Sequence, residues 1–330
     1  MAAAVAERLV RSRGSTSPDH GAKPAKRPVD EYVRRGAVVL DKPEGPSSHQ
    51  VAAWVRDIFD VDKAGHAGTL DPNVTGLLPI GLADATKGLE PLKAQDKAYV
   101  GVIELHDDVP RNRIEEALST FTGDVYQRPP KRSAVKRQLR VRRIDDFDAI
   151  EIDDRRILAR VDCEGGTYIR KLAHDVGTYL GVGAHLDELR RTRVGHITED
   201  RAVTLHDVKD AWEEFKQTGR DDWLREAVIP FERLLDHLPR ITVRDTAVDA
   251  VCHGAPLAIP GVLDIERTIS AGDQVVLMTL KGEAVALAEA EKTAVETIMQ
   301  ETGVVARPHR QLMDEGTYPQ HWGEDEAEDA

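Results

Sequence analysis

The strongest constraint on the fold is a change in sequence pattern near residue 238. Before it, apolar residues at helical spacing, as in 51–58, alternate with short apolar runs typical of strands, as in 36–40. After it, short strand-like runs are separated by turns that contain glycine; they lie at 241–243, 274–278 and 284–287. The pattern predicts a larger domain of helices and strands over residues 31–237, followed by a small β-rich domain over residues 238–310.

The two ends of the chain are predicted to lie outside these domains. Residues 1–30 are rich in Ala, Arg, Ser and Pro without apolar periodicity, which predicts a disordered arm. Residues 311–330 are predicted to form a solvated acidic tail. No run of about 18 apolar residues indicates a membrane span, and no apolar leader follows the first arginines. With only two cysteines, we expect a reduced, cytoplasmic protein that does not associate with membranes.

The net charge argues against a nucleic-acid partner, but the distribution of charge does not. The chain has 45 Lys and Arg against 58 Asp and Glu, a balance of −13. Residues 128–143 nevertheless contain eight basic residues and no acid. Pro129 and Pro130 predict a loop for the first half of this basic segment. The segment is either a solvated charged loop or a contact for nucleic-acid phosphates.

A glycine-rich segment, Gly65–Pro72, is the most informative part of the sequence. Its glycines let the backbone approach a ligand closely, and Pro72 holds Asp71 in an extended conformation. A carboxylate on such a loop suits a nucleophile or a base. The ordinary alternative is a turn or helix-capping aspartate, and composition alone leaves both open.

A second segment, Cys163–Leu172, predicts the end of a strand, a Gly-Gly turn and a helix that continues to Leu180. Thr167 is the predicted cap of this helix. Arg170 lies in its first turn, where the helix dipole disfavours a cation. We therefore expect a carboxylate or phosphate beside Arg170, the alternative being a solvated side chain.

Together these segments resemble the TruB/dyskerin family of pseudouridine synthases. The resemblance covers residues 35 to 310 in the family's order. Its motifs are the catalytic-aspartate motif at 65–72, the active-site tyrosine segment at 97–99, the third motif at 166–170, the N-terminal motif at 40–48 and the thumb loop at 127–136. The Pro129–Pro130 pair, the segment Cys252–Pro256 and the C-terminal module are similar to the archaeal and eukaryotic dyskerin branch.

The resemblance implies an α+β pseudouridine synthase fold, with a mixed, mainly antiparallel central sheet flanked by helices, followed by a small β-rich PUA pseudobarrel. It implies that the protein isomerises uridine to pseudouridine in RNA and needs no metal or other cofactor. The alternative is a non-catalytic RNA-binding scaffold that uses the PUA module alone.

The resemblance also assigns the site residues. Asp71 would be catalytic and paired with Arg170, and an adjacent cation favours the ionised form of a carboxylate. Tyr99 would stack on the base, and Tyr168 would support the site. His66 would fill the space left by a flipped-out base, whereas Lys42 would support the loop or simply contact backbone. The thumb-loop residues that would contact RNA are Arg128, Lys131, Arg132, Lys136 and Arg137.

The substrate stays open between rRNA uridines selected by a box H/ACA guide RNA and the T-loop uridine of tRNA. In guided complexes the family's companions are a kink-turn-binding protein, a zinc-ribbon protein and a small β-barrel protein. The acidic balance, with Arg in excess over Lys, is similar to that of proteins from halophilic archaea, and we expect a salt-adapted protein.

Overall fold

The computed structural model describes residues 7–128 and 138–320 and contains two compact units. The larger unit is made of residues 38–80 and 89–228. The smaller unit combines residues up to 37, residues 81–88 and the chain from 229 onward. Each unit has its own buried apolar core.

A mixed sheet forms the centre of the larger unit. Its strand order is β2-β4-β9-β5-β8-β7-β6, with β3 paired to β4 and β10 to β9. Strand β4 runs parallel to β9, whereas every neighbouring pair from β9 to β6 is antiparallel. The strands are β2 (Gly36–Lys42), β3 (Ala64–His66), β4 (Val74–Leu82), β5 (Lys97–Leu105), β6 (Gly123–Gln127), β7 (Arg140–Asp153), β8 (Arg156–Cys163), β9 (Ala184–Val194) and β10 (Ile197–Thr198). The predicted mixed, mainly antiparallel sheet is confirmed.

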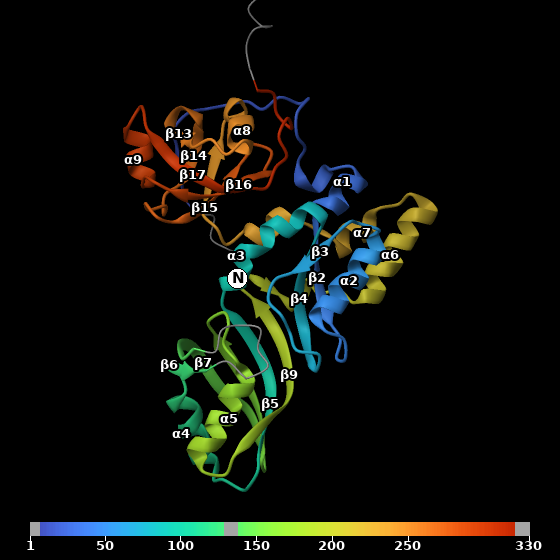
Figure 1. Ribbon diagram of the computed structural model, residues 1–330, viewed down its shortest axis with the longest axis vertical. Coiled ribbons are helices and arrows are strands. Elements are labelled where there is room, and N and C mark those ends of the chain that lie inside the picture. The colour runs from blue at the N-terminus through green and yellow to red at the C-terminus, as the bar shows by residue number, and fades with distance from the viewer. Residues whose placement is uncertain (1–6, 129–137, 321–330) are drawn as a thin grey trace, which may run out of the picture. The chain divides into compact units, whose positions relative to one another are not determined.

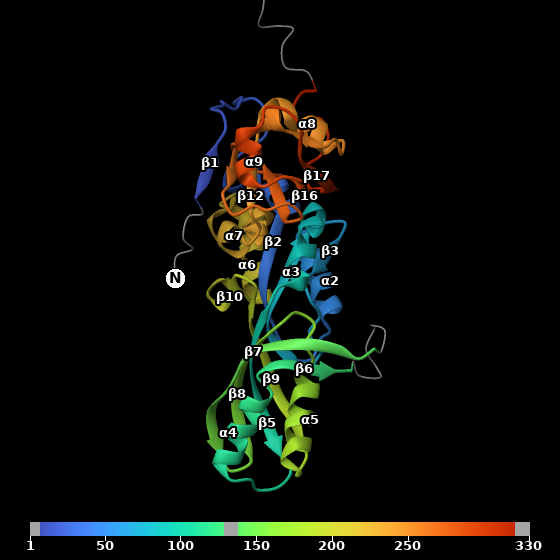
Figure 2. The same cartoon turned by 90° about the vertical axis from the view of Figure 1, so that its left-hand side faces the viewer.

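Helices cover this sheet. They are α2 (Ser48–Phe59), α3 (Glu90–Ala94), α4 (Arg111–Thr120), α5 (Ile169–Leu180), α6 (Leu205–Thr218) and α7 (Asp222–Ala227). Helices α4 and α5 lie side by side, with α5 against β9 and α4 against β7 (Figures 1 and 2). Helix α2 packs against β3 and α6. A capping box is present at the start of α6, where Thr204 and Asp207 bond reciprocally.

Helix α5 begins at Ile169, so its cap lies one residue after the predicted cap, Thr167. Tyr168 is the N-cap residue, while the Thr167 hydroxyl donates to the Glu164 carbonyl at 2.8 Å. The predicted cap at Thr167 is therefore wrong, because that hydroxyl bonds back into the preceding turn. The apolar face of the helix is buried as expected, with Leu172 and Val176 at 1% and 0% exposure.

The smaller unit is a seven-stranded sheet in the order β1-β14-β12-β15-β16-β17-β13. Its strands are β1 (Arg8–Val10), β12 (Arg240–Val243), β13 (Leu257–Ala258), β14 (Val262–Glu266), β15 (Gln274–Met278), β16 (Ala284–Ala290) and β17 (Val304–Gln311). Its helices are α1 (Val29–Arg34), α8 (Asp245–Cys252) and α9 (Ala294–Met299). Strand β11 (Ile229–Pro230) pairs with the first residues of β2. The strands predicted after residue 238 are confirmed.

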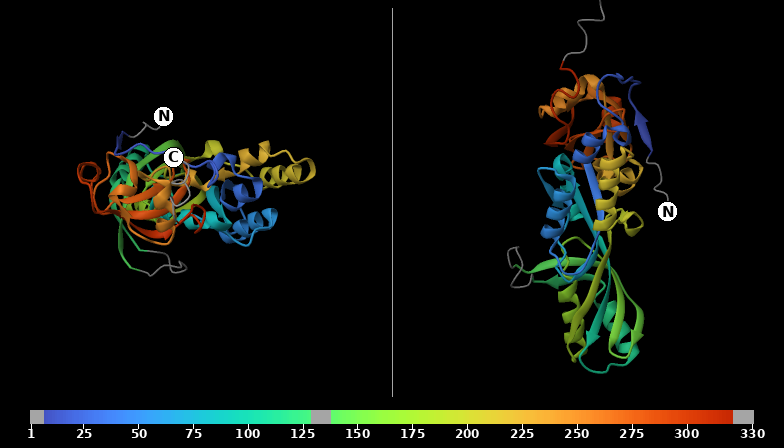
Figure 3. Two further views of the ribbon diagram at one scale, coloured as in Figure 1. Left: turned by 90° about the horizontal axis from the view of Figure 1, so that it is seen from above. Right: turned by 90° about the vertical axis from the view of Figure 1, so that its right-hand side faces the viewer.

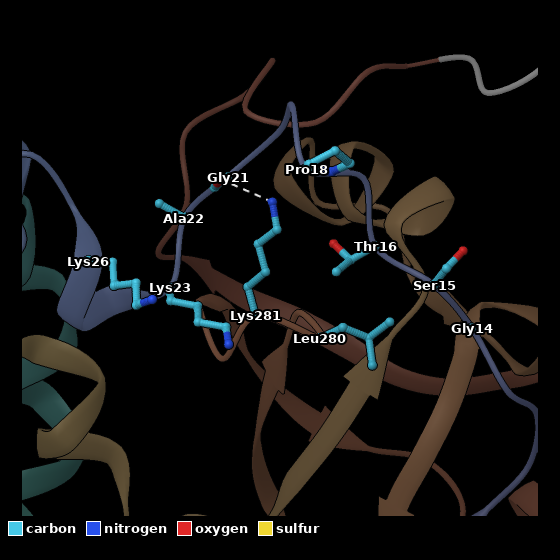
Figure 4. A pocket seen from close by; sticks show the side chains of 10 residues that line it. All are labelled: Gly14, Ser15, Thr16, Pro18, Gly21, Ala22, Lys23, Lys26, Leu280 and Lys281. Atoms are coloured by element: carbon cyan, nitrogen blue, oxygen red, sulfur yellow. Dashed lines mark hydrogen bonds between the residues drawn. The ribbon is translucent and has the colours of Figure 1, made fainter.

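The N-terminal segment belongs to this β-rich unit, so the prediction of a disordered arm is wrong for residues 7–30. Strand β1 pairs antiparallel with β14, and the chain then runs along the unit (Figure 3). Arg27 is buried and pairs with Glu232 at 2.7 Å. Lys281 donates to the carbonyl of Gly21 at 3.2 Å (Figure 4). Amino-acid composition does not predict that this segment is ordered, because backbone pairing and ion pairs hold it in place.

The predicted acidic tail is also wrong for residues 311–320. Leu312, Met313 and Tyr318 are buried, and the Tyr318 hydroxyl donates to Glu283 at 2.7 Å. Glu283 also accepts a hydrogen bond from the Ala22 amide at 2.9 Å, so one buried carboxylate binds both ends of the chain. Residues 321–330 lie outside the described part of the chain. The two compact units divide between residues 228 and 229. The domain boundary at 237/238 stays a prediction.

In the described residues, no helix is long and apolar enough to cross a bilayer.

Candidate active site

Asp71 and Arg170 meet although they are far apart in sequence. Asp71 lies on the loop between β3 and β4, and Arg170 lies in the first turn of α5. The Arg170 guanidinium donates to an Asp71 carboxylate oxygen at 2.6 Å. Both side chains stay more than half exposed, at 56% for Asp71 and 62% for Arg170. The expected anionic partner of Arg170 is therefore this carboxylate, and the pair remains open to a ligand.

Lys42 holds the backbone of the loop around Asp71. This side chain is fully buried, and its ammonium donates to the carbonyls of Pro43, Pro72 and Val74 at 2.8, 3.0 and 2.9 Å. Burial lowers the pKa of Lys42. Lys42 therefore contacts backbone, and two of its three partners, Pro72 and Val74, lie just after Asp71. A supporting role for Lys42 in the active site stays a prediction.

Ser48 fixes the residue before Asp71. Its hydroxyl accepts from the Leu70 amide at 2.8 Å and is 2.9 Å from the Leu70 carbonyl, to which it donates. On the other side, the Gly45 amide donates to the Pro72 carbonyl at 2.9 Å. Asp71 thus lies between two anchored residues, which restricts where its carboxylate can point.

A second buried cation, Arg191 on β9, supports the same loop. Its guanidinium donates to the carbonyls of Leu77 at 2.8 Å and Gly68 at 3.0 Å. Gly68 has φ +84°, and a Cβ there would lie 3.3 Å from the guanidinium, so glycine suits both the conformation and the contact. Only 1% of Arg191 is exposed.

Tyr99 lies next to Arg191 across the β5–β9 pairing. The tyrosine is 7% exposed, and burial raises the pKa of its hydroxyl, while a hydrogen bond from Arg191 acts in the opposite direction. Lys97, two residues earlier, donates to the carbonyls of Lys93 and Gln95. Burial lowers the pKa of Lys97 to about 8. Tyr99 is thus accompanied by two buried cationic side chains.

His66 forms an edge-to-face contact with His49 of α2, with ring centroids 4.8 Å apart. Burial lowers the pKa of His66 to about 4, with further lowering from His49 and Arg191. The imidazole is therefore neutral near pH 7.

The start of α5 is tied to the β6–β7 hairpin. The Gln127 side chain accepts from the Tyr168 amide at 2.9 Å and donates to the Tyr168 carbonyl at 3.2 Å. Arg142 of β7 pairs with Glu164 at 2.8 Å. These contacts position the turn that carries Arg170. Arg128 is exposed at the end of β6, whereas Lys131, Arg132, Lys136 and Arg137 lie outside the described residues.

Sequence reasoning missed Arg191, Lys97, Ser48 and Gln127 as supports of this site. A buried arginine inside the run Arg190–Arg193 has no local signature, because the same letters are typical of an exposed strand. Within the described residues, no cluster of three or more His, Cys, Asp or Glu side chains could hold a metal ion.

An exposed carboxylate with an arginine partner, on a loop anchored to the same sheet that carries a buried tyrosine, suits nucleophilic or electrostatic catalysis by an acidic side chain. The chain belongs to the TruB/dyskerin family of pseudouridine synthases. The family model of the TruB pseudouridylate synthase N-terminal domain matches residues 56–169, and that of the tRNA pseudouridylate synthase B C-terminal domain matches residues 170–236. A PUA domain matches residues 239–312, and a DKCLD domain matches residues 3–52.

Similar proteins cover nearly the whole chain. A probable tRNA pseudouridine synthase B of Methanopyrus kandleri is 52% identical over 317 residues, 96% of this chain and 94% of that protein. The Methanosarcina barkeri protein of the same name is 48% identical over 315 residues, 95% and 93% of the two chains.

Solved structures agree with this assignment. A chain from a Cbf5-Nop10-Gar1 complex matches with a TM-score of 0.89 and 43% identity, over 96% of this chain and 97% of that one. A chain from an H/ACA RNP bound to a substrate RNA containing 2′-deoxyuridine matches with a TM-score of 0.90 and 40% identity, over 97% and 98%. The protein is a pseudouridine synthase with a C-terminal PUA domain.

The lowered pKa of His66 predicts a pH-dependent stability. Because the pKa falls from 6.5 in the unfolded chain to about 4 in the fold, His66 stabilises the protein above pH 6.5. This contribution is lost as the pH falls from 6.5 toward 4. Between pH 7.5 and 5, denaturant unfolding should show the wild type losing about 1–2 kcal/mol more than His66→Asn.

The matched control for this experiment is His309→Asn, since His309 is an exposed histidine on β17. The control should follow the wild type at both pH values. Equal pH dependence in the wild type and His66→Asn would contradict the neutral buried imidazole.

Proposed function

We propose that Asp71 is the catalytic carboxylate for the conversion of uridine to pseudouridine in RNA. The observation that carries the proposal is the 2.6 Å contact between Asp71 and Arg170. An exposed, ion-paired carboxylate on a loop anchored at Leu70 and Pro72 is available to a substrate and limited to a narrow range of positions. Pre-positioning of this kind is a major source of catalytic rate.

The proposed isomerisation uses mainly Asp71, Arg170 and the tyrosines of the site. The bond from C1′ to N1 breaks, the base turns, and a bond from C1′ to C5 forms; C5 then loses its proton and N1 gains one. Asp71 assists departure of the base by attack or by charge, and Arg170 keeps its carboxylate oriented. Tyr99 is the proposed surface on which the base stacks. Tyr168 ties the helix that carries Arg170 to the β6–β7 hairpin through Gln127.

A base inside a stacked helix is out of reach, so the target must flip out, which costs a few kcal/mol. His66 is the proposed residue that fills the vacated space. A neutral imidazole suits that position, because no charge has to enter the stack. Arg128 and the thumb loop are proposed to hold RNA phosphates without reading sequence.

Replacing Asp71 by Asn should abolish pseudouridine formation, by at least about 1,000-fold, because the amide is neither a nucleophile nor an anion. RNA binding should stay within about threefold of the wild type, since a single side chain is changed by one atom. Single-turnover conversion and filter binding measure the two quantities, with the exposed Asp62→Asn as the matched control. A fully active Asp71→Asn enzyme would refute the catalytic role and favour the alternative of a non-catalytic RNA-binding scaffold.

We also propose that the substrate is chosen by a box H/ACA guide RNA, with rRNA uridines as targets and the T-loop uridine of tRNA as the second candidate. The support is the match over nearly the whole chain to proteins from H/ACA complexes, including the PUA and N-terminal regions. The tRNA candidate is favoured by the names of the similar archaeal proteins. The proposed companions are a kink-turn-binding protein, a zinc-ribbon protein and a small β-barrel protein.

One assay with purified protein distinguishes guided rRNA from T-loop tRNA as the substrate. Guided selection predicts that rRNA fragments are modified only when the matching guide RNA and the three companions are added, and that a guide with mismatched pairing gives no product. Modification of T-loop tRNA at equal or higher rate without guide RNA would favour the tRNA alternative.

We propose that the protein works in a cytoplasm of high salt concentration. The support is the balance of −13, together with surface arginines that each meet carboxylates, as Arg160 meets Asp146 at 2.9 Å. At about 1 M salt the Debye length is only about 3 Å, so repulsion among the acidic groups and toward RNA is screened.

This proposal predicts a melting temperature that rises between 0.1 and 2 M KCl and activity that persists in molar salt. Circular dichroism melts and single-turnover assays across that range measure both. A melting temperature independent of salt, or RNA modification lost above about 0.5 M KCl, would contradict the proposal.

A further inference from the structure

Arg191 is a buried cation whose charge is not neutralised by an acid. It is 1% exposed, and within residues 7–128 and 138–320 no carboxylate lies at ion-pair distance from it. Its neighbour Arg190, by contrast, pairs with Asp41 at 2.8 Å and with Glu199. Burying an uncompensated guanidinium costs free energy, which the hydrogen bonds of Arg191 must offset.

Those contacts converge on the reaction centre. One hydrogen bond goes to the carbonyl of Gly68, which precedes Asp71 by only three residues on the same loop. The guanidinium also lies within hydrogen-bonding reach of the Tyr99 hydroxyl, its partner across the β5–β9 pairing. A third bond, to Leu77 on β4, anchors the side chain to the sheet. One rigid planar group therefore touches the catalytic loop, the tyrosine and the sheet at once.

The pairing of β5 with β9 determines which residue faces Arg191. The β5–β9 register shifts between Ala98 and Tyr99, which places Tyr99 opposite Arg191. The Arg191 guanidinium faces the Tyr99 oxygen, and its N–H groups favour a phenolic hydrogen that points away from it. Arg191 thus links the strand position of Tyr99 to the Gly68 carbonyl of the loop that carries Asp71.

We propose that Arg191 is a positioning residue for the isomerisation, which sets the Tyr99 hydroxyl and the Asp71 loop relative to each other. The inference rests on the proposed roles of Asp71 and Tyr99. Arg191 itself does not touch the substrate. Its effect passes through Tyr99 and Gly68, so it should appear in the rate of the chemical step and not in RNA affinity.

The test uses the full-length enzyme with Arg191→Lys and Arg191→Gln, each also combined with Tyr99→Phe. Lysine keeps the charge but cannot hold the loop and the hydroxyl together, so Arg191→Lys should lower the single-turnover rate by about 10- to 100-fold. Its RNA Kd should stay within about threefold of the wild type. In the Tyr99→Phe background, where the hydroxyl is gone, the same change should cost less than about threefold.

Arg190→Gln, which removes only surface ion pairs on the same strand, is the matched control and should keep the rate within about threefold. Arg191→Lys with a wild-type rate would overturn the proposal, as would an equal loss with and without Tyr99→Phe. Failure of both Arg191 variants to fold, judged by melting, would also overturn it in favour of a structural role. If Asp71→Asn is active, the catalytic assignment itself fails, which is a separate outcome.

Discussion

The loop that carries Asp71 is held by two buried cations that donate to its backbone. Lys42 meets carbonyls on the C-terminal side of Asp71, and Arg191 meets Gly68 on the N-terminal side. Carbonyl oxygens accept hydrogen bonds from these two cations but carry no formal charge that would neutralise them. The backbone around Asp71 therefore keeps positive charge beside it. The exposed Asp71 carboxylate thus projects from a loop whose backbone is anchored on both sides.

The sheet of the larger unit and its helices position Arg170 beside Asp71. Helix α5 packs its apolar face, with Leu172 and Val176, into the core of the larger unit, which leaves Arg170 facing outward in the first turn. Gln127 of β6 clamps the backbone of Tyr168 just before that turn. A cation at a helix N-terminus is unfavourable by itself, and the Asp71 carboxylate offsets this cost.

Local patterns predicted the parts that depend on nearby residues. The loop with Asp71 and the amphipathic helix α5 both follow from residues within a few positions of one another. Arg191 could not be predicted, because its burial depends on a register shift between β5 and β9 that no local signal encodes. Tyr318 was missed for a similar reason, since its partner Glu283 lies 35 residues away within a tail that composition describes as solvated. The net charge, a sum over the chain, did not show where the basic segment lies.

The central claim is that a carboxylate held at one place by a fixed loop carries out the isomerisation. Asp71→Glu tests it most directly, since the charge and chemistry are kept while the carboxylate moves outward by one methylene. We expect the single-turnover rate of Asp71→Glu to be lower by at least about 100-fold with unchanged RNA affinity. A rate within about threefold of the wild type would contradict it, because position would then not matter.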